Sequence, residues 1–343
     1  MNGENKKIAV YGAGAMGTVL GALLSGSRGG NTVDLVSRNR AHIEAMKKTG
    51  AHIVCKADSR EFTTKVNALF PEEMTENYDV VFLMTKQKEN GEIAEFLKGR
   101  LAENGVVCTS QNGLPEESLA RVLGEEKVYG AVCAWGATFV GGGTAELTSQ
   151  RSAMTMQIGG CASKADRADA VREILSRCGI SVSVTENLSG VRWSKLAINA
   201  AFSGLSVLTG LTFGEIARRR GTRRLALEVL RECFSVASAS GVTLEKMQGH
   251  DMEKLLGKKG FFGTQKALFV LPIAMRKHKN LVSGMLKDIE KGRKCEIDYI
   301  TGAVCRQGDK FGVETPLCDR VTEIAHGIEN GLYEISYKNI EFF

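Results

Sequence analysis

A run of small and apolar residues, GVRWSKLAINAAFSGLSVLTG (190–210), carries polar side chains at a spacing that could support catalysis. Lys195, Asn199 and Ser203 follow one another at intervals of four residues, so on a helix they share one face. An ammonium group at such a position can donate both a hydrogen bond and a proton to an oxygen atom. Apolar side chains cover the rest of the predicted helix.

This polar face allows two interpretations. In the first it faces water, as on many amphipathic helices, and Lys195 is solvated. In the second it faces a cleft, and Lys195 is partly desolvated beside a substrate, which would explain a lone ammonium in so apolar a segment. Arg192 and Ser206 lie near the two ends of the face.

Length and composition are those of a soluble globular protein. The chain has 343 residues, of which 43% are hydrophobic and 24% charged, enough for two domains with a sizeable core. No apolar run approaches the roughly 18 residues of a membrane span. The N-terminus shows no apolar core followed by a small-residue cleavage site, so we expect a cytoplasmic protein that does not bind membranes.

The net charge of +6 is modest and spread along the chain. Its densest basic cluster combines residues 218–220 with Arg223 and Arg224. No nucleic-acid-binding motif accompanies this cluster, which favours a solvated face or a position near an anionic cofactor over a nucleic-acid partner.

Cysteine and histidine spacing gives no support for metal chemistry. The nine cysteines include no C-x-x-C pair, and the five histidines include no H-x-x-x-H pair. We therefore expect neither a disulfide framework nor a metal site. Cys295 is the one cysteine inside a segment of functional interest, and we interpret it as a packing residue.

The N-terminus carries the dinucleotide-binding fingerprint in its required context. A short buried strand, KIAVY (7–11), runs into GAGAMG (12–17) and then into a helical stretch. This order of strand, G-x-G-x-x-G and helix places the pyrophosphate of a dinucleotide at the helix N-terminus. The residues expected to contact the cofactor here are Gly12, Gly14, Ala15, Met16 and Gly17.

The end of the next predicted strand, TVDLVSR (32–38), indicates which dinucleotide binds. An NAD site usually places an acidic residue at this end to hold the ribose 2′-hydroxyl. Here Ser37 and Arg38 occupy it, with Arg40 nearby, while Asp34 lies inside the strand. A serine and an arginine suit a 2′-phosphate, so we expect NADPH.

Further strands should extend the same sheet. We predict strands at 78–84, 105–110, 128–134, 154–158 and 180–184, with a turn at Gly141–Gly143. Lys86 follows the first of these and Asn112 follows the second. Because parallel strands end at the cofactor crevice, both residues are candidates for cofactor contact, although a solvent-exposed lysine and a turn asparagine are equally ordinary.

The second half changes to helical spacing, with predicted helices at 190–208, 222–240, 264–275 and 315–330. We therefore predict an α/β Rossmann-type domain over residues 1–186, followed by an all-α domain over residues 187–343. Folds of this kind commonly place the active site in the cleft between the domains.

A second informative segment is SGMLKDIEKGRKCEIDYITGAV (283–304). Apolar anchors alternate in it with carboxylates that include Glu296. Taken alone, the pattern indicates a surface helix followed by a buried one, with Glu296 exposed to solvent.

Together these motifs resemble the ketopantoate reductase family, NADPH-dependent 2-dehydropantoate 2-reductases, over nearly the whole chain. The resemblance rests on GAGAMG followed by LVSR, on TSQNGL, on WSKLAIN and on SGMLKDIEKGRKCEIDYITGAV, in this order.

The resemblance implies roles for particular residues. Lys195 matches the family's catalytic acid, which protonates the 2-oxo oxygen as hydride arrives. Asn112, Asn199 and Glu296 match residues near the substrate, and Asn112 also lies near the nicotinamide. Lys86 matches a lysine that lies against the cofactor. Ser37 and Arg38 occupy the 2′-phosphate position, where Arg38 matches the arginine that meets the phosphate.

Three substrate-side positions depart from the family pattern. Ser203 stands where the family has a second asparagine, Gly284 replaces a serine, and Thr301 replaces an asparagine. Because a site built around particular hydrogen-bond donors loses discrimination when they are shortened, the identity of the substrate is open to change.

We therefore expect an NADPH-dependent reductase of 2-dehydropantoate, a small-molecule enzyme and possible homodimer that binds no nucleic acid. Two alternatives remain: a reductase of another branched or bulkier 2-oxo acid, and a non-catalytic NADPH-binding sensor. The extended C-terminus, GIENGLYEISYKNIEFF, has no role assigned from sequence.

Overall fold

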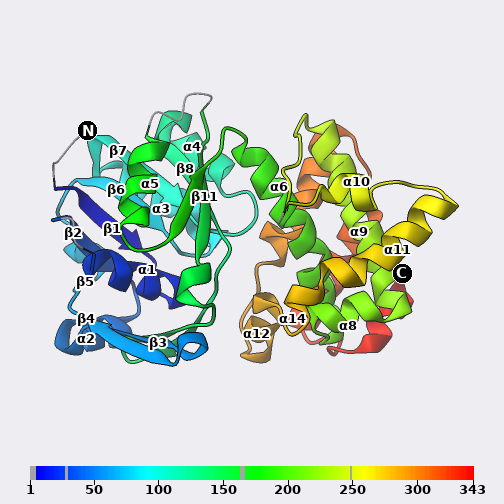
Figure 1. Cartoon of the computed structure of the whole chain (residues 1–343), viewed down its shortest axis with the longest axis horizontal. Helices are drawn as coiled ribbons and strands as arrows, with labels where there is room; N and C mark the ends of the chain where they lie inside the picture. Colours follow the sequence, from blue (N-terminus) through cyan, green and yellow to red (C-terminus); the bar gives the residue numbers. More distant parts are fainter. Residues whose placement is uncertain (1–4, 28–29, 163–166, 248) are drawn as a thin grey trace. The chain divides into compact units, whose positions relative to one another are not determined.

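The computed structural model describes residues 5–27, 30–162, 167–247 and 249–343. By its internal contacts the chain forms two compact units (Figure 1). The first comprises Met1–Gln111 and Pro115–Leu188, and the second comprises Asn112–Leu114 and Ser189–Phe343. The sequence placed the domain boundary after residue 186 and gave no sign that residues 112–114 join the helical unit.

The first unit is built on an eight-stranded sheet in the order β12-β11-β8-β7-β6-β1-β2-β5. Neighbouring strands are parallel except β8 and β11, which pair antiparallel. The strands are β1 Lys7–Tyr11, β2 Thr32–Val36, β5 Asn67–Leu69, β6 Tyr78–Leu83, β7 Leu101–Thr109, β8 Val128–Cys133, β11 Thr155–Gly160 and β12 Ser181–Val184.

The strand order reverses beside β1. From β1 the chain passes to β2 on one side, and β6 later pairs with the other side of β1. In doubly wound sheets such a switch point is where ligands bind. The helices of this unit are α1 Ala15–Ser25, α2 Arg40–Thr49, α3 Asn90–Lys98, α4 Glu116–Leu123 and α5 Ala168–Ser176.

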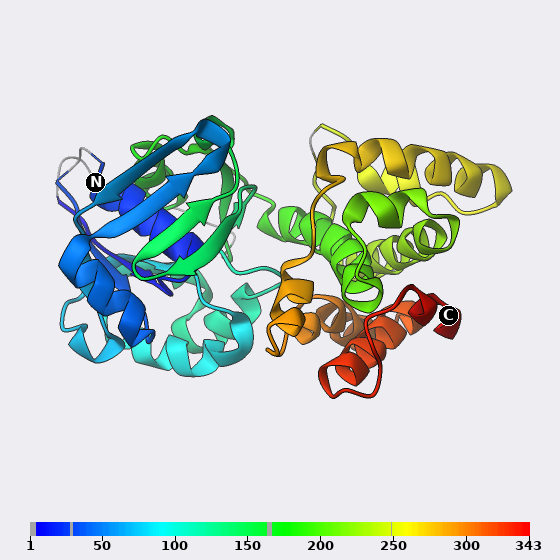
Figure 2. The same cartoon turned by 90° about the horizontal axis from the view of Figure 1, so that it is seen from below.

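A second, four-stranded sheet in the order β4-β3-β10-β9 was not predicted from the sequence. Its strands are β3 Ala51–Cys55, β4 Arg60–Thr64, β9 Ala137–Gly141 and β10 Thr144–Leu147. Helix α1 packs against both this sheet and the main one (Figure 2), which explains why its residues Thr18–Leu24 include no exposed position. The strands are short and half-exposed, so they lack the continuous apolar run that marks a buried strand.

The second unit is helical. Its elements are α6 Leu188–Ile198, the π-helical turn η6 Asn199–Ser203, α7 Gly204–Thr209, α8 Phe213–Arg218, α9 Arg220–Ala239, α10 Met252–Leu256, α11 Phe261–Ala274, α12 Gly284–Glu290, α13 Thr301–Phe311 and α14 Pro316–Glu329. The long helix α9 contacts α8, α10, α11, α13 and α14. The predicted fold class, a Rossmann-type domain followed by an all-α domain, is confirmed. Within the described residues, none of the helices combines the length and apolar character needed to cross a bilayer.

The C-terminal extension completes the helical core. A 3-10 turn, η9 Tyr337–Phe342, packs against α7. The buried amide of Asn339 donates hydrogen bonds to the carbonyl oxygens of Leu208 (2.8 Å) and Glu334 (2.9 Å), and the backbone N–H of Ser336 also donates to Leu208. The extension therefore satisfies a carbonyl at the end of α7 that would otherwise lack a partner.

Candidate active site

The glycine-rich turn leaves β1 at the switch point of the main sheet. Gly12 has a φ of 104°, a left-handed conformation that favours glycine, and its N–H donates to the carbonyl of Val36 at 2.8 Å. A side chain at Gly17 would meet the Gly12 carbonyl oxygen at 2.2 Å. Both glycines are therefore required for the turn to form.

Gly14 differs from these two glycines because the space beside it is open. A Cβ built there would have only the Gly12 carbonyl oxygen within reach, at 4.0 Å. Gly14 is the N-cap of α1, and no side-chain capping bond satisfies the first N–H groups of this helix. This cradle fits the pyrophosphate of a dinucleotide, with Ala15 and Met16 in the first turn of the helix.

Ser37 and Arg38 follow the end of β2, as expected. Arg38 is largely exposed, yet its guanidinium already forms an ion pair with the carboxylate of Glu89, in the turn that follows β6. Sequence reasoning did not find this pairing, because the two residues lie 51 positions apart. An acidic group therefore lies beside the arginine expected to bind a 2′-phosphate.

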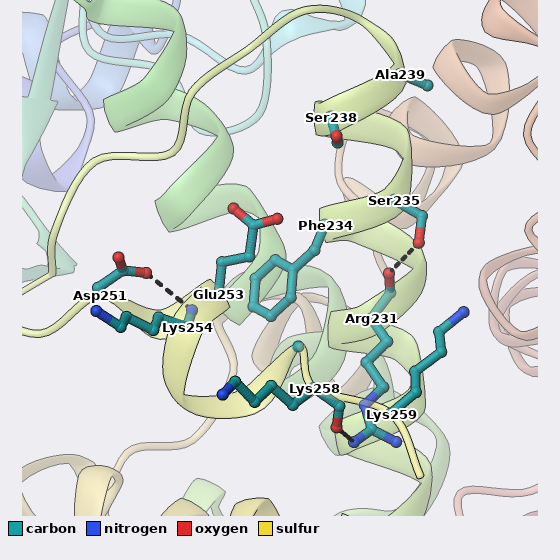
Figure 3. A pocket seen from close by; sticks show the side chains of 11 residues that line it. Arg231, Phe234, Ser235, Ser238, Ala239, Asp251, Glu253, Lys254, Lys258 and Lys259 are labelled. Atoms are coloured by element: carbon teal, nitrogen blue, oxygen red, sulfur yellow. Dashed lines mark hydrogen bonds between the residues drawn. The ribbon is translucent and has the colours of Figure 1, made fainter. Parts of the chain in front are cut away.

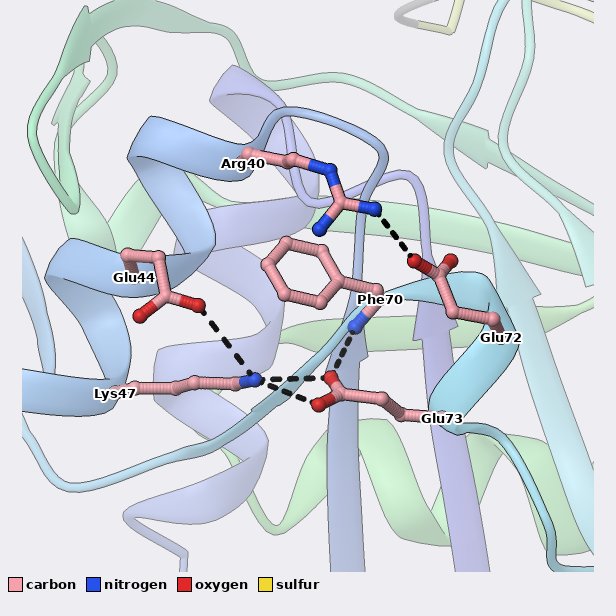
Figure 4. Close-up of polar contacts among 6 residues, drawn as sticks. All are labelled: Arg40, Glu44, Lys47, Phe70, Glu72 and Glu73. Carbon is pink, nitrogen blue, oxygen red and sulfur yellow. Dashed lines mark hydrogen bonds and ion pairs between the residues drawn. The ribbon is translucent and has the colours of Figure 1, made fainter.

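Arg40 belongs to a separate cluster, shown in Figure 4. Its guanidinium pairs with Glu72 at 2.8 Å and lies over the ring of Phe70, 4.6 Å from the centroid. Lys47 approaches the same ring and pairs with Glu73. Hydrogen bonds from Lys47 and from the backbone of Phe70 hold the pKa of Glu73 below its ordinary value. These contacts tie α2 to the segment after β5, so Arg40 is engaged in holding the fold.

Asp34 is fully enclosed and has structural partners. Its carboxylate accepts hydrogen bonds from the Tyr78 hydroxyl and the Asn67 amide, both at 2.7 Å. Burial, together with this bond to Asp34, raises the pKa of Tyr78 far above its ordinary value. Excluding Asp34 from the cofactor residues on sequence grounds agrees with this arrangement.

A buried amide pair fixes the loops after β6 and β7. Gln111 and Asn90 exchange two side-chain hydrogen bonds, at 2.7 and 3.1 Å, and Gln111 also bonds Thr109 and Thr85. Thr85 lies beside Gly12, whose added Cβ would meet the Thr85 nitrogen at 2.7 Å. Gln111 thus positions the backbone next to the glycine turn, a role that sequence reasoning missed although it noted the TSQNGL motif.

Lys86 and Asn112 follow these two strands, and both side chains are exposed. Lys86 belongs to the first unit, next to the 3-10 turn η3 Gln87–Glu89. Asn112 belongs to the second unit together with Leu114, which packs against the helical core. Asn112 therefore belongs to the same unit as Lys195, and Lys86 belongs to the same unit as the glycine turn.

The polar face predicted on the helix around Lys195 is present. Between Val191 and Thr209, the residues that are not buried are Lys195, Ile198, Asn199 and Ser203. The apolar residues around them fill the core of the second unit. Lys195 is partly buried and interacts with other groups of the protein, which favours a partly desolvated lysine over one that is simply solvated.

The same helix contains a π-turn that was not predicted. Residues Asn199–Ser203 are π-helical, and α-helix resumes at Gly204. A π-turn accommodates an extra residue and is frequently found at functional sites. It begins at Asn199, one turn after Lys195, and ends at Ser203, so it spans the stretch that joins the other two polar residues of this face.

Arg192 and Ser206 do not belong to this face. Both are buried, and the hydroxyl of Ser206 donates to the carbonyl of Leu211 at 2.8 Å while accepting from the backbone of Ser283. Placing them near the ends of the polar face is thus corrected: Ser206 closes the turn after α7 and joins it to the start of α12.

Glu296 lies between α12 and α13, two helices that both contact the π-turn. It is partly buried rather than exposed and precedes the 3-10 turn η8 Ile297–Tyr299. Asp298 in this turn bonds His326 of α14 at 2.8 Å, and the backbone N–H of Cys295 donates to Glu329 at 2.7 Å. Two bonds to α14 therefore fix the segment on both sides of Glu296.

Cys295 agrees with the packing interpretation. Burial, reinforced by Glu329, raises the pKa of its thiol to about 12. A thiol with so high a pKa is not a nucleophile at neutral pH.

The three positions that depart from the family pattern have different surroundings. Ser203 is partly exposed, and Gly284 is exposed with open space around it. Thr301 is fully buried at the start of α13, and its hydroxyl lacks a hydrogen-bond partner among the described residues. Only the first two positions present their shortened side chains to solvent.

A hollow of about 680 Å³ lies elsewhere in the helical unit, lined by α9, α10 and the residues after α10 (Figure 3). Arg231 borders it, with its guanidinium bonded to the carbonyls of Leu256 and Lys258 and to Glu228. None of the predicted site residues lines this hollow. The hollow is lined by Arg231, which holds the backbone after α10, and by the exposed lysines Lys254, Lys258 and Lys259.

Two family models match the chain. The ketopantoate reductase PanE/ApbA model covers residues 8–159, and the ketopantoate reductase PanE/ApbA C-terminal model covers residues 187–329. The chain belongs to the ketopantoate reductase family. It is 27% identical to the 2-dehydropantoate 2-reductase of Streptococcus pyogenes serotype M6 over 94% of this chain and 97% of that protein. The corresponding enzyme of Archaeoglobus fulgidus is 26% identical over 95% and 99%.

Solved structures agree with this assignment. A PanE/ApbA family ketopantoate reductase from Ralstonia eutropha JMP134 superposes with a TM-score of 0.79 at 25% identity, covering 95% of this chain and 99% of that one. D-mandelate dehydrogenase, solved with NADH and anilino(oxo)acetate, gives a TM-score of 0.79 at 23% identity over 95% and 99%. This family member therefore shares its fold with oxidoreductases that bind a nicotinamide dinucleotide.

Proposed function

We propose that this family member reduces 2-dehydropantoate to pantoate with NADPH, a step of pantothenate and coenzyme A biosynthesis. The observation that carries the proposal is the helix of residues 191–209, where Lys195, Asn199 and Ser203 are the polar side chains left partly open. Relatives that are 24–28% identical and named 2-dehydropantoate 2-reductase support this substrate class.

The first unit offers the cofactor site. The open space at Gly14 and the N-terminus of α1 would hold the pyrophosphate, with Gly12 and Gly17 shaping the turn. Ser37 and Arg38 would meet the 2′-phosphate, and Lys86 would lie against the cofactor. When bound, the dinucleotide supplies the hydride that reduces the substrate carbonyl.

The second unit offers the acid. Lys195 would donate a hydrogen bond to the 2-oxo oxygen of the substrate and transfer a proton to it as the carbonyl becomes an alkoxide. The ammonium then stabilises the charge that develops on oxygen, which is the interaction that lowers the barrier. Asn112, Asn199, Ser203 and Glu296 would bind and orient the substrate beside it.

A second candidate function is NADH-dependent reduction of a bulkier 2-oxo acid. Glu89 beside Arg38 places a negative charge where a 2′-phosphate would bind, which works against NADPH. Gly284 and Ser203 remove side-chain volume from two open positions. A non-catalytic NADPH sensor is less compatible with a partly buried Lys195 beside two polar residues, because a sensor has no use for an acid.

A panel assay distinguishes these functions. The purified protein is incubated with NADPH or NADH and with 2-dehydropantoate, 2-oxoisovalerate or phenylglyoxylate, and the loss of reduced-nicotinamide absorbance is followed. We expect the highest kcat/KM with NADPH and 2-dehydropantoate. Preference for NADH together with phenylglyoxylate would establish the second candidate. Preference for 2-oxoisovalerate, or for NADH with 2-dehydropantoate, would contradict both assignments, and binding of NADPH without turnover of any acid would establish a sensor.

Replacement of Lys195 tests the chemical role. Lys195→Ala should bind NADPH normally but lose about 100- to 10,000-fold in kcat, the range for a general acid. The exposed Lys338→Ala is the matched control and should leave kcat unchanged. A Lys195→Ala enzyme that keeps near wild-type turnover on its best substrate would refute the assignment.

A further inference from the structure

Helix α11 exposes large apolar side chains along its outer face. Phe262, Phe269 and Ile273 are 86%, 73% and 60% exposed, and neighbouring Phe261 is 73% exposed. The inner face carries Ala267 and Leu271, which are fully buried. A helix that is apolar on both faces is normally covered on both, so the outer face lacks the cover that its composition calls for.

The exposed area is large enough for a specific interface. A phenylalanine or similar side chain contributes about 150–250 Å² when fully buried, so these four leave roughly 500 Å² of apolar surface on each copy. Two such faces together reach the ~1,000 Å² expected of a biological interface. The patch is thus of the right size for a second copy of this chain.

The spacing on this face fits pairing with an identical helix. Phe262, Lys266, Phe269 and Ile273 are all exposed and follow one another at intervals of four, three and four residues. This is the seam spacing of a left-handed helix pair. The order of these intervals is the same from either end of the helix. An antiparallel copy would therefore bring Phe262 against the partner's Ile273 and Lys266 against the partner's Phe269.

We propose that α11 is a homodimer interface in which two copies pack antiparallel about a two-fold axis. The symmetric contacts are isologous, as in most homodimers. Each Lys266 ammonium would lie over an aromatic ring, a favourable cation–π contact, and a single lysine in an apolar seam fixes the register. This proposal does not depend on which 2-oxo acid the enzyme reduces.

The effect of charge at this face distinguishes a second copy of the chain from an anionic lipid surface. Basic side chains flank the helix at both ends, including Lys258, Lys259, Arg276 and Lys277, and an aromatic helix among cations can bind lipid headgroups. A lipid surface and a dimer favour opposite charges at position 269. In the dimer this position would face Lys266 of the partner subunit, which is positively charged. A negative charge there helps the dimer and a positive charge opposes it.

The test compares Phe269→Glu with Phe269→Lys in the full chain by sedimentation equilibrium. Both substitutions remove the same ring, so their difference reports the partner's charge. In 0.15 M NaCl the wild type should be dimeric, and Phe269→Glu should associate at least about tenfold more tightly than Phe269→Lys, because two symmetric ion pairs replace two like-charge contacts. The difference should shrink in 1 M NaCl.

The control pair is Leu332→Glu and Leu332→Lys, at a 75% exposed position outside α11, and both variants should dimerise like the wild type. Circular dichroism melting shows whether each variant is folded. A monomeric wild type at 100 μM, or equal association of the two Phe269 variants, would overturn the proposal. Flotation with phosphatidylglycerol vesicles that favours Phe269→Lys over Phe269→Glu would assign the face to lipid instead.

Discussion

Arg38 is the residue on which cofactor preference should depend, and its ion pair with Glu89 makes that preference adjustable. The guanidinium side chain is 69% exposed, so solvent weakens the pair but does not remove the charge of Glu89 from the site. A 2′-phosphate must displace or share this carboxylate. The ribose 2′-hydroxyl of NADH can instead donate a hydrogen bond to this carboxylate.

Glu89→Gln should therefore strengthen NADPH binding by about two- to fivefold, because it removes a like charge from the phosphate and releases Arg38. NADH binding should stay the same or weaken. Isothermal titration calorimetry with each cofactor measures both effects.

Arg38→Ala provides the companion measurement. This substitution should weaken NADPH binding about 10- to 100-fold, because the charge-assisted contacts to the 2′-phosphate are lost. The affinity for NADH should stay nearly unchanged. In the Arg38→Ala background, Glu89→Gln should lose most of the benefit that comes from releasing the arginine. Equal losses of both cofactors in Arg38→Ala would show that this arginine does not read the phosphate.

At this scale the sequence predicted residue types well and partners poorly. The fingerprint singled out Gly12 and Gly17, and each occupies a backbone position that a Cβ would block. Their contact with a cofactor stays a prediction. Glu89 and Gln111 were missed because their partners lie far along the chain and no local spacing pairs them. A polar residue between two strand motifs gives no sign of the side chain that it will meet.

The elements around Glu296 are fixed by α14 through a titratable contact. Burial opposes the charge on His326, but hydrogen bonds with Glu329 and Asp298 outweigh it and raise the pKa of the imidazole above its ordinary 6.5. Because folded protein then binds this proton more tightly than unfolded protein, the stabilisation is complete below about pH 6.5. It is lost as pH rises through the raised pKa.

His326→Gln should consequently lower the melting temperature at pH 6 and have a smaller effect at pH 9. The glutamine keeps a side-chain donor but cannot carry a charge. Differential scanning calorimetry of both proteins at the two pH values checks this. An identical shift at both values would mean that the contact contributes no charge effect.

The π-turn shows what helical periodicity leaves out. The four-residue spacing placed Lys195, Asn199 and Ser203 on one face, and the structure agrees, although the helix changes type at Asn199. The sequence pattern is the same for both helix types here, because small residues such as Ala200 and Ala201 are accommodated by either. The second sheet was missed for a related reason: strands such as β4 expose most of their side chains and carry little apolar signal.

The two units do not correspond to two continuous stretches of chain. Leu114 packs in the core of the second unit, although the residues on both sides of Asn112–Leu114 belong to the first. Composition changes after about residue 186, which is why the sequence suggested a simple boundary. A segment of only three residues that belongs to the other unit produces no detectable change in composition along the chain.

Leu114→Ala should therefore destabilise the helical unit by about 1–2 kcal/mol, as expected for truncation of a partly buried leucine. Hydrogen exchange read by mass spectrometry should show faster exchange in α9 and unchanged exchange in β1. The control, Leu123→Ala in the core of the first unit, should do the reverse. Faster exchange confined to β1 in Leu114→Ala would assign Leu114 to the first unit.

The position of Asn112–Leu114 in the chain also has a consequence during synthesis on the ribosome. Leu114 is made 75 residues before Ser189, where the rest of its unit begins. At roughly 5–20 residues per second, several seconds pass in which the leucine has been translated but the helices that will cover it have not. During that interval the nascent chain carries an apolar side chain that only a later part of the same chain can bury.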